Sequence, residues 1–414
     1  MSTNELVPKP MGLYDQISLM WLVPLTVARA VFTFASRSAD SVSLHWRQKF
    51  SISLLQSLRL SLNPRHVFAY SHRRHTGAAV KAYCHERGLT YTVVTAELAE
   101  HTSEGNDRQT PPPLLHIVTP AKAPVDGPTL LYAHGGGYLN PLQAPGHMPF
   151  ALRCADSCGA SRVIFIEYSL SSEFGYPTQL IQMVATVKYL LNHPLPGISG
   201  NAGIRPETLI LAGDSAGGHL IASLLAHVVR PSPYAPPLTE LGPEKGKQLC
   251  AVALFSPWLT MRTTDASFVA NNESDYLSAQ QLEFFIKLFK PSLTEVWASP
   301  IEADGASAVW KAVFPPEMHA RASDVTSCPV AKRILVTTGA GETLFDSCVK
   351  FGRELLRADM IVVDSDEKVS AVASKEAVLT IVPAEAHVQP VLDSALGYAH
   401  GWSMKSVEMF LKSL

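Results

Sequence analysis

Short apolar segments alternate with longer stretches of helical periodicity along most of this chain. Two such segments, 91–94 and 114–118, come first. Six more are short, rich in β-branched residues and separated by helical stretches: 128–133, 162–168, 208–212, 250–255, 333–338 and 377–382. This alternation is typical of a mostly parallel sheet with helices on both faces. The pattern therefore predicts an α/β fold with an eight-stranded, mostly parallel sheet flanked by helices.

Three regions depart from this alternation. Residues 1–105 carry apolar and basic residues at helical spacing, which predicts a mainly helical N-terminal cap followed by the first strand. Residues 106–414 are then expected to form the main α/β domain. Within it, residues 257–328 are too many for a plain strand-to-helix connection and are expected to contribute a mainly helical lid. Residues 363–375 are charged and small, and are expected to form an exposed loop before the last strand.

An apolar stretch covers residues 17–35 of the N-terminal region. Pro24 and Arg29 interrupt it, whereas a membrane span needs about 20 apolar residues without a central charge. A signal peptide is expected to carry basic residues before its apolar core, but Glu5 and Asp15 precede this one. We expect a buried cap helix here. The alternative is a helix that lies shallowly in a membrane surface.

The motif Gly213-Asp214-Ser215-Ala216-Gly217-Gly218 joins the apolar segment 208–212 to the helical stretch 219–229. A strand, a tight turn and a helix in this order are what a nucleophile elbow requires, with Ser215 at the apex. The glycines two residues to either side let the chain bend and let the helix approach the strand. Ser215 is therefore the candidate nucleophile.

A second glycine-rich motif, His134-Gly135-Gly136-Gly137-Tyr138, follows the segment 128–133. Consecutive glycines leave backbone N–H groups free to point at a ligand, as acyl transfer requires when its carbonyl oxygen gains negative charge. A phosphate-binding loop is the alternative, but neither G-x-x-x-x-G-K-[ST] nor G-x-G-x-x-G with a downstream acid accompanies the motif. The order of the two motifs indicates an oxyanion hole followed by its nucleophile.

Together these residues resemble the hormone-sensitive-lipase-like esterases of the α/β-hydrolase superfamily. A third stretch, Ser274-Asp275-Tyr276-Leu277-Ser278 followed by Ala298-Ser299-Pro300, is similar to the family's segment after the sixth strand. The resemblance covers about residues 128–414. It implies an α/β-hydrolase fold with the chain order serine, acid, histidine.

The base implied by this order lies beyond the nucleophile. His387 follows the segment 377–382, in the loop where the family carries its catalytic histidine. His219 and His227 lie on the helix after the elbow and are expected to pack against their neighbours. His319 lies in a proline-rich stretch of the predicted lid. His387 is therefore the candidate base.

The acid is expected after the preceding strand, 333–338. The family commonly shows D-P-L-x-D there, whereas this chain has Glu342 in place of the first aspartate and Thr343 in place of the proline. Either carboxylate can accept the imidazole N–H, so Glu342 is the candidate acid. Asp346, one helical turn later, is the runner-up.

Other candidate residues follow from the same resemblance. The oxyanion would be bound by the backbone N–H groups of Gly136, Gly137 and Ala216, the first two by resemblance to the family. Aromatic side chains are the candidates for the substrate pocket: Tyr138, Trp258 and Tyr276, with Phe268, Phe284 and Phe285.

Charge and cysteine spacing exclude several classes of partner and cofactor. A net charge of −2 and a pI near 6.7 give no electrostatic basis for binding nucleic acid. The six cysteines form no C-x-x-C pair, so neither a zinc site nor a disulfide framework is expected, and no cofactor or metal is called for. A reducing compartment follows, with the protein cytoplasmic or loosely membrane-associated through its N-terminal region.

These features favour a serine esterase. An apolar lid suggests a short-acyl ester of a hydrophobic alcohol, such as a lipid or a secondary metabolite. A lactonase, thioesterase, amidase or transesterase would use the same residues. A binding protein on a hydrolase scaffold, as in the plant gibberellin receptors that resemble this family, is a third class; those receptors lack the working histidine, whereas His387 is present here.

Overall fold

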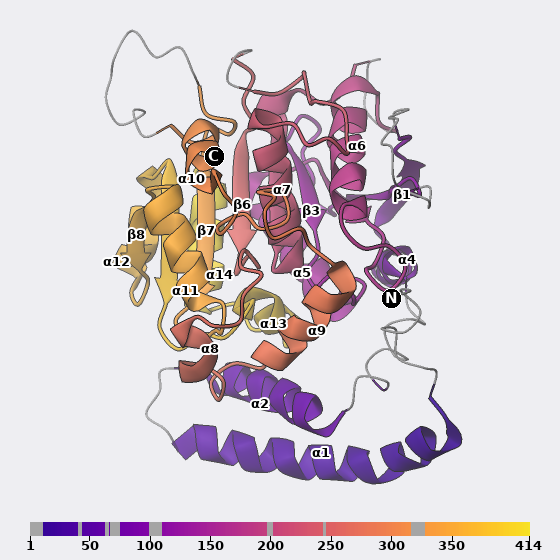
Figure 1. The fold of residues 1–414 in the computed structure, drawn as a ribbon, viewed down its shortest axis with the longest axis vertical. Coiled ribbons are helices and arrows are strands. Elements are labelled where there is room, and N and C mark those ends of the chain that lie inside the picture. The colour runs from indigo at the N-terminus through magenta and orange to yellow at the C-terminus, as the bar shows by residue number, and fades with distance from the viewer. Residues whose placement is uncertain are drawn as a thin grey trace.

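A single mixed sheet organises the molecule. The computed structural model describes residues 11–39, 44–62, 66, 75–98, 110–196, 202–242, 246–315 and 328–414. The sheet order is β1-β2-β4-β3-β5-β6-β7-β9-β8, antiparallel at β1/β2 and β2/β4 and parallel elsewhere (Figure 1). The strands are β1 Thr90–Thr95, β2 Leu114–Thr119, β3 Thr129–Ala133, β4 Arg162–Glu167, β5 Leu209–Asp214, β6 Ala251–Phe255, β7 Ile334–Gly339, β8 Asp359–Val362 and β9 Ala377–Val382.

Helices cover both faces of this sheet, because its central strands are apolar on both sides. Along β5, Leu209 and Leu211 face one cluster of buried side chains, while Ile210 and Ala212 face the other. The first cluster is closed by α6 Thr178–Asn192, α7 Ala216–Val229, α10 Ala306–Val313 and α11 Phe345–Lys350. The second is closed by α4 Thr76–Arg87, α5 Ala144–Cys158, α12 Asp366–Ala371 and α14 Trp402–Lys412. The predicted fold class is confirmed.

Two details of the predicted sheet are wrong. Within the described residues the sheet has nine strands rather than eight, because the sequence pattern did not reveal β8. That edge strand is four residues long and buries only Ile361, so it lacks the apolar run that marks the other strands. The expected loop at 363–375 contains α12, whose N-cap Ser365 accepts a hydrogen bond from the Lys368 N–H.

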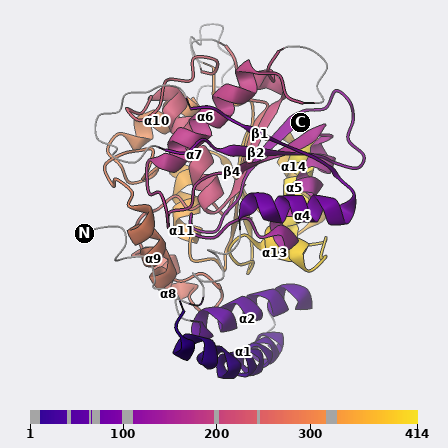
Figure 2. The ribbon, with the colours of Figure 1, turned by 90° about the vertical axis from the view of Figure 1, so that its right-hand side faces the viewer.

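The carboxyl ends of the parallel strands are covered by helices from two regions, the predicted N-terminal cap and the predicted lid. These are α1 Leu13–Ala39 and α2 Trp46–Ser61 from the N-terminal region, and α8 Ala266–Ala270 and α9 Ala279–Phe289 from the predicted lid. Two views show α1 and α2 side by side beyond α8 and α13 Gln389–Ala395 (Figures 1 and 2). Helix α10 instead packs on α7 beside the sheet, and the lid residues 316–327, including His319, lie outside the described residues.

The expectation that residues 17–35 form a buried helix is wrong. Helix α1 forms, but Met20, Trp21 and Phe32 are largely exposed. The residues that it buries include Asp15 and Thr26. Apolar composition predicted burial, but α1 turns its charged residues and Thr26 toward the protein, together with Ala30 and Phe34, and leaves most of its large apolar side chains exposed.

Candidate active site

The loop between β5 and α7 holds Ser215 in a strained turn. Its φ of 49° and ψ of −117° lie where side chains other than glycine are rarely found, which is the conformation of a nucleophile elbow. The Ser215 N–H donates to the carbonyl of Phe255 at 2.9 Å. A Cβ on Gly217 would lie 2.0 Å from the carbonyl oxygen of Ala133, so only glycine lets α7 start this close to β3.

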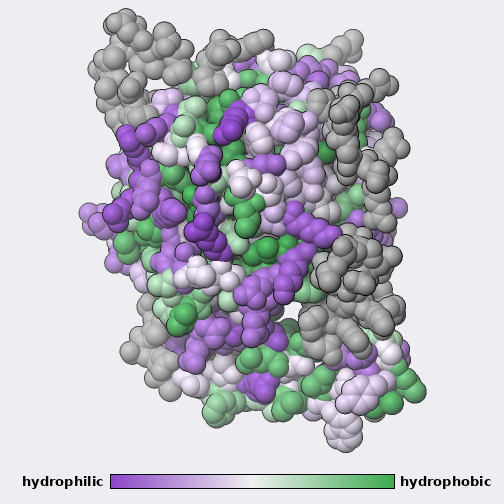
Figure 3. Space-filling view, viewed as in Figure 1, coloured by the Kyte–Doolittle hydropathy of each residue, from purple (hydrophilic) through white to green (hydrophobic). Residues whose placement is uncertain are grey.

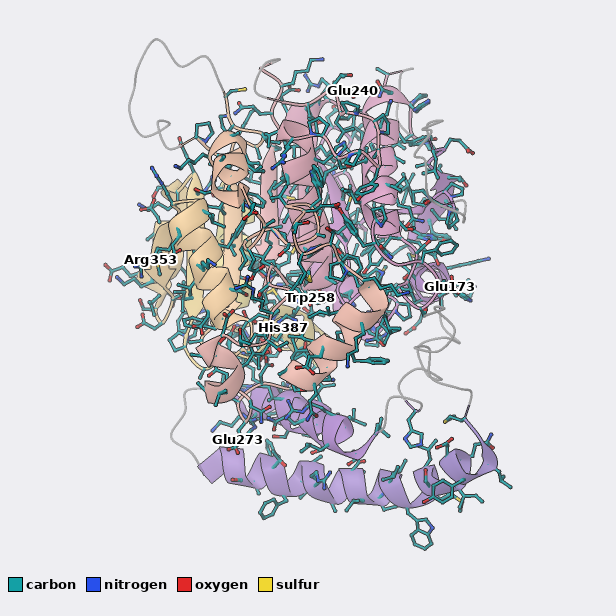
Figure 4. All side chains as sticks on the ribbon, viewed as in Figure 1. Glu173, Glu240, Trp258, Glu273, Arg353 and His387 are labelled. Carbon is teal, nitrogen blue, oxygen red and sulfur yellow. The ribbon has the colours of Figure 1, made fainter. Side chains whose placement is uncertain are left out.

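The structure brings Ser215, His387 and Glu342 into one hydrogen-bonded chain. His387 Nε2 lies 2.9 Å from Ser215 Oγ, and His387 Nδ1 lies 3.2 Å from Glu342 Oε2. The other carboxylate oxygen, Oε1, accepts a short hydrogen bond from the Thr338 hydroxyl on β7. All three predicted residues are buried at the carboxyl end of the sheet, where Figure 4 shows His387 below the strands, between α8 and α9 in this view. The distances suit transfer of the serine proton to the imidazole.

The environment of His387 favours the protonated ring. Burial alone would lower its pKa, but the hydrogen bond and charge of Glu342, with the charges of Asp275 and Asp214, raise the pKa above its ordinary value. An imidazolium is therefore stabilised at the point where the ring would receive the serine proton. A base must be neutral to start the reaction. Because the pKa of His387 is raised, activity should be lost on acidification at a higher pH than for a histidine with the ordinary pKa.

The runner-up acid, Asp346, is not part of this chain. Its Oδ2 accepts the Ser267 N–H at 2.8 Å, at the first turn of α8. The carboxylate that contacts the imidazole is that of Glu342, because the loop turns directly after β7. Asp346 thus anchors a cap helix to the acid loop.

The glycine loop lies directly against the elbow. A Cβ on Gly135 would lie 3.0 Å from Ser215 Cβ. Gly136 and Gly137 have φ values of 109° and 62°, a left-handed backbone that glycine adopts without strain. Together with the start of α7 at Ala216, the loop places its backbone beside the nucleophile. Donation from Gly136, Gly137 and Ala216 to an oxyanion stays a prediction, since it needs a bound substrate.

Buried polar groups fix this loop in place. The Asp214 carboxylate accepts the Gly135 N–H at 3.0 Å and the Tyr132 hydroxyl at 2.6 Å, and it also contacts His147. His134 Nδ1 lies 2.7 Å from the carbonyl of Gly135, and burial lowers the pKa of His134 to about 4. Asp214 therefore joins the loop to the elbow, and a neutral His134 supports the loop.

The three candidate pocket residues differ in exposure. Tyr138 is fully buried, its ring stacks on Phe289, and its hydroxyl lies 2.6 Å from His219 Nδ1, so it packs in the core. Trp258 is also buried, and its indole N–H has no hydrogen-bond partner among the residues that the structure describes. Tyr276 is partly exposed, with its ring 6.0 Å from that of His387. Of the three, Tyr276 has the surface a ligand could contact.

Sequence reasoning missed Asp275 as a functional residue. Its buried carboxylate accepts the backbone N–H of His387 on Oδ1 at 3.2 Å. Oδ2 accepts both the N–H and the hydroxyl of Thr343, at 2.8 and 3.0 Å. Asp275 therefore clamps the base loop to the acid loop. The family commonly has proline where this chain has Thr343, and proline has neither of the two donors that bind Asp275. The threonine at this position was the sequence signal that could have pointed to Asp275.

Asp275→Asn is expected to lower kcat by about 10²-fold with little change in KM, because an amide cannot accept on both sides and a small displacement of His387 is costly. Loss of the charge also removes one cause of the raised His387 pKa, so the acid limb of the pH–rate profile should move to lower pH. Exposed Glu273→Gln is the matched control. An Asp275→Asn enzyme with the wild-type kcat and pH profile would show that the clamp is dispensable.

A pair of buried carboxyl groups lies behind the His387 loop. Gln48 Nε2 of α2 donates to Glu385 Oε1 at 3.3 Å and to Asp393 Oδ2 at 2.9 Å. Burial and the neighbouring Glu385 raise the pKa of Asp393 to about 8, and burial raises the pKa of Glu385 as well. Burial, together with the charges of Asp393 and Glu385, also raises the pKa of Tyr398. The pair therefore holds a proton near neutral pH. The hydrogen bonds from Gln48 to both carboxyl groups connect α2 to the loop that carries His387.

The raised pKa values of Asp393 and Glu385 determine whether this pair makes the fold more or less stable as the pH rises. Carboxyl groups whose pKa is higher in the folded protein stabilise the fold at low pH, and this contribution is lost as pH rises from about 4 toward about 8. The contribution of this pair to wild-type Tm should therefore fall across that range, whereas the lowered pKa of His134 contributes in the opposite direction between about pH 4 and its ordinary pKa. Glu385→Gln keeps an acceptor for Gln48 and removes one charge, so the decline in Tm between pH 5 and about 8 should shrink. Thermal unfolding at several pH values measures both, and equal slopes would refute the assignment.

Among the residues that the structure describes, no group of three or more His, Cys, Asp or Glu side chains is arranged to hold a metal ion.

Comparison with known proteins agrees with this geometry. A sequence profile of the α/β-hydrolase fold matches residues 130–358. An acetyl-hydrolase of Streptomyces hygroscopicus is 32% identical over 162 residues, which cover 39% of this chain and 45% of that protein. Human hormone-sensitive lipase is 33% identical over 101 residues, 24% of this chain and 9% of that protein. The matched regions thus span less than half the length of both relatives.

Solved structures show the same fold over a longer range. A thermostable esterase of Pseudomonas putida superposes with a TM-score of 0.59, covering 90% of this chain and 97% of that one at 17% identity. The profile match includes both the glycine motif and the elbow and extends over more than half of the chain. The chain therefore belongs to the α/β-hydrolase fold family, and its resemblance to the hormone-sensitive-lipase-like members is confirmed.

Proposed function

We propose that this protein is a serine esterase that cleaves short-acyl esters of hydrophobic alcohols. The observation that carries the proposal is the contact of 2.9 Å between Ser215 Oγ and His387 Nε2, continued to Glu342 at 3.2 Å. A serine hydroxyl is a weak nucleophile near neutral pH and needs such a base, oriented by a carboxylate.

The mechanism follows from these contacts. Ser215 Oγ bonds to the ester carbonyl carbon while its proton passes to His387 Nε2. The carbonyl oxygen becomes an oxyanion that the N–H groups of Gly136, Gly137 and Ala216 would bind. The C–O bond to the alcohol then breaks, and His387 returns the proton to the departing oxygen. Water then gives a proton to the same ring while its oxygen bonds to the acyl carbon. The bond between that carbon and Ser215 Oγ breaks, and His387 returns the proton to Oγ, which frees the acid and the serine.

The acyl side is proposed to be short. Phe285 of α9 lies directly over the glycine loop: a Cβ on Gly137 would lie 2.3 Å from its ring. This ring leaves little room beside the proposed oxyanion hole. The name of the Streptomyces relative, an acetyl-hydrolase, points the same way. Phe285 also packs, with Phe284, against the buried Leu139 and Leu288, and an apolar cluster beside the glycine loop favours an uncharged substrate.

Rates with a series of p-nitrophenyl esters test this proposal. Acetate and butyrate should be cleaved faster than long-chain esters, and the reverse order would refute the short-acyl part. Hydrolysis and acyl transfer are separated by adding a competing alcohol and measuring the products. A predominance of the transfer product in water would favour a transesterase. Cleavage of lactones, thioesters or amides in preference to esters would favour those activities on the same residues.

We further propose an intracellular location, in the cytoplasm or loosely attached to a membrane through the N-terminal region. Cys84, Cys154 and Cys348 are buried and form no disulfide, as is common in reducing compartments.

A further inference from the structure

Helix α1 has an inverted distribution of polar and apolar side chains. Its sequence contains three charged residues, Asp15, Arg29 and Arg37. Asp15 is buried and accepts the Gly12 N–H, Arg29 Nη1 donates to Ser61 Oγ of α2 at 3.2 Å, and Arg37 donates to the carbonyl of Glu273. The charged side chains of α1 are therefore engaged on the side that faces the protein.

The opposite side of α1 is apolar and exposed, and we call it the outer face. Its most exposed apolar side chains are each at least 63% accessible: Leu13, Tyr14, Met20, Trp21, Val31 and Phe32. Hydrophobic residues recur along the lower edge of the molecule, where α1 lies (Figure 3). A helix of a water-soluble surface has the reverse arrangement, with its polar stripe toward solvent.

We propose that the outer face of α1 binds the lipid–water interface of a bilayer, with the helix lying in the membrane plane. Tyr and Trp are enriched at that interface because an apolar ring carries a polar group, and Tyr14 and Trp21 both lie on the outer face. The face contains no charge that would have to enter the acyl region. An amphipathic helix with such a face partitions into the boundary between headgroups and acyl chains.

The contacts of α1 favour this orientation over a helix that spans the bilayer. Residues Leu13–Arg37 are long and apolar enough to cross a membrane by length and composition. To do so, α1 would have to leave α2, break the contacts of Arg29 and Arg37, and carry charged groups into hydrocarbon, which is costly. Lying in the plane keeps every one of these contacts and covers only the outer face.

Helices α1 and α2 are connected to the catalytic end of the molecule. Gln56 of α2 donates to the carbonyls of Glu273 and Asp275, at 2.7 and 2.8 Å. Arg59 donates to the carbonyl of Leu277 at 3.0 Å. These contacts hold the segment that carries the Asp275 clamp. Figure 4 shows Glu273 beside the left-hand end of the α1–α2 pair. Under the proposed function, a hydrophobic ester dissolved in the bilayer would thus be concentrated beside the catalytic end.

Vesicle binding of the full-length protein tests the proposal without relying on ester hydrolysis. The probe is sedimentation with phosphatidylcholine vesicles, which carry no net charge. The doubly substituted protein Trp21→Gln/Phe32→Gln should bind vesicles about tenfold or more weakly than wild type. Val125→Gln, which changes an 88% exposed valine on another loop, is the control and should bind as wild type does. A thermal unfolding transition at the wild-type temperature would show that the double variant folds.

Depth of insertion separates the alternatives. Vesicles with lipids brominated near the headgroup or near the chain end quench tryptophan at different depths, and the difference between wild type and Trp21→Phe isolates Trp21. Stronger quenching near the headgroup supports the in-plane helix. Stronger quenching at the bilayer centre overturns it in favour of a span. Absence of vesicle binding, or dimerisation that the double variant abolishes without any lipid binding, overturns it in favour of a solvent-exposed face or a second copy.

Discussion

Ser215→Ala is expected to reduce kcat for p-nitrophenyl acetate by about 10⁵-fold or more while the protein still folds. The substitution removes the only atom that can form the acyl-enzyme in the proposed mechanism, Ser215 Oγ, which lies 2.9 Å from the imidazole. What remains should be the background that binding and the oxyanion hole supply without a nucleophile. Steady-state kinetics, with thermal unfolding to show that the variant is folded, make this measurement.

A buried serine on the same helix provides the matched control. Ser223 Oγ donates within α7 to the carbonyl of His219 at 2.9 Å, two turns from the elbow. Ser223→Ala removes a hydrogen bond of comparable burial but no reacting atom, so it should cost stability and leave kcat within a few fold. Wild-type turnover in Ser215→Ala would overturn every enzymatic assignment made for this site.

Glu342→Gln is expected to lower kcat by about 10⁴-fold, because the amide should stabilise the wrong histidine tautomer. The Thr338 hydroxyl donates to Oε1, so the amide oxygen of glutamine will occupy that position. The amide nitrogen then faces His387 Nδ1 and donates to it. The imidazole proton is thereby transferred to Nε2, the atom that should accept the serine proton. The variant should therefore fold and bind substrate, yet turn over slowly.

Asp346→Asn provides the comparison that decides between the two acids. Its carboxylate accepts the Ser267 N–H, not an imidazole N–H, so this variant should lose no more than a few fold in kcat. The pH profile gives a second readout. Glu342 is a main cause of the raised His387 pKa, so in Glu342→Gln the residual activity should persist to lower pH than in wild type. If Asp346→Asn proved the more damaging of the two, the assignment of Glu342 as the acid would be incorrect.

The sequence predicted the strands and the elbow because each has a local signal. A β-branched run between helical stretches, or a serine between glycines, can be recognised without knowing the rest of the fold. The pairing of Ser215 with His387 joins positions 172 residues apart, and it was predicted only through the chain order of the family that the two motifs resemble.

Features set by tertiary contacts were not predictable in this way. Asp275 acts through backbone N–H groups of two distant loops, and no spacing in the sequence records such contacts. Strand β8 has too few buried residues to produce an apolar run. For α1, hydropathy predicted burial, whereas the partners of Arg29 and Arg37 on neighbouring segments decide which face packs inward. Tyr138 was expected beside substrate, but its hydroxyl finds a buried partner in His219.

Labelling with a fluorophosphonate that reacts with activated serines, followed by peptide mapping, most directly tests whether the three buried side chains form one reactive unit. A single adduct on the peptide that contains the elbow serine, its formation slowed in Glu342→Gln, is the predicted result. An unlabelled protein, or an adduct on any other residue, would contradict the account.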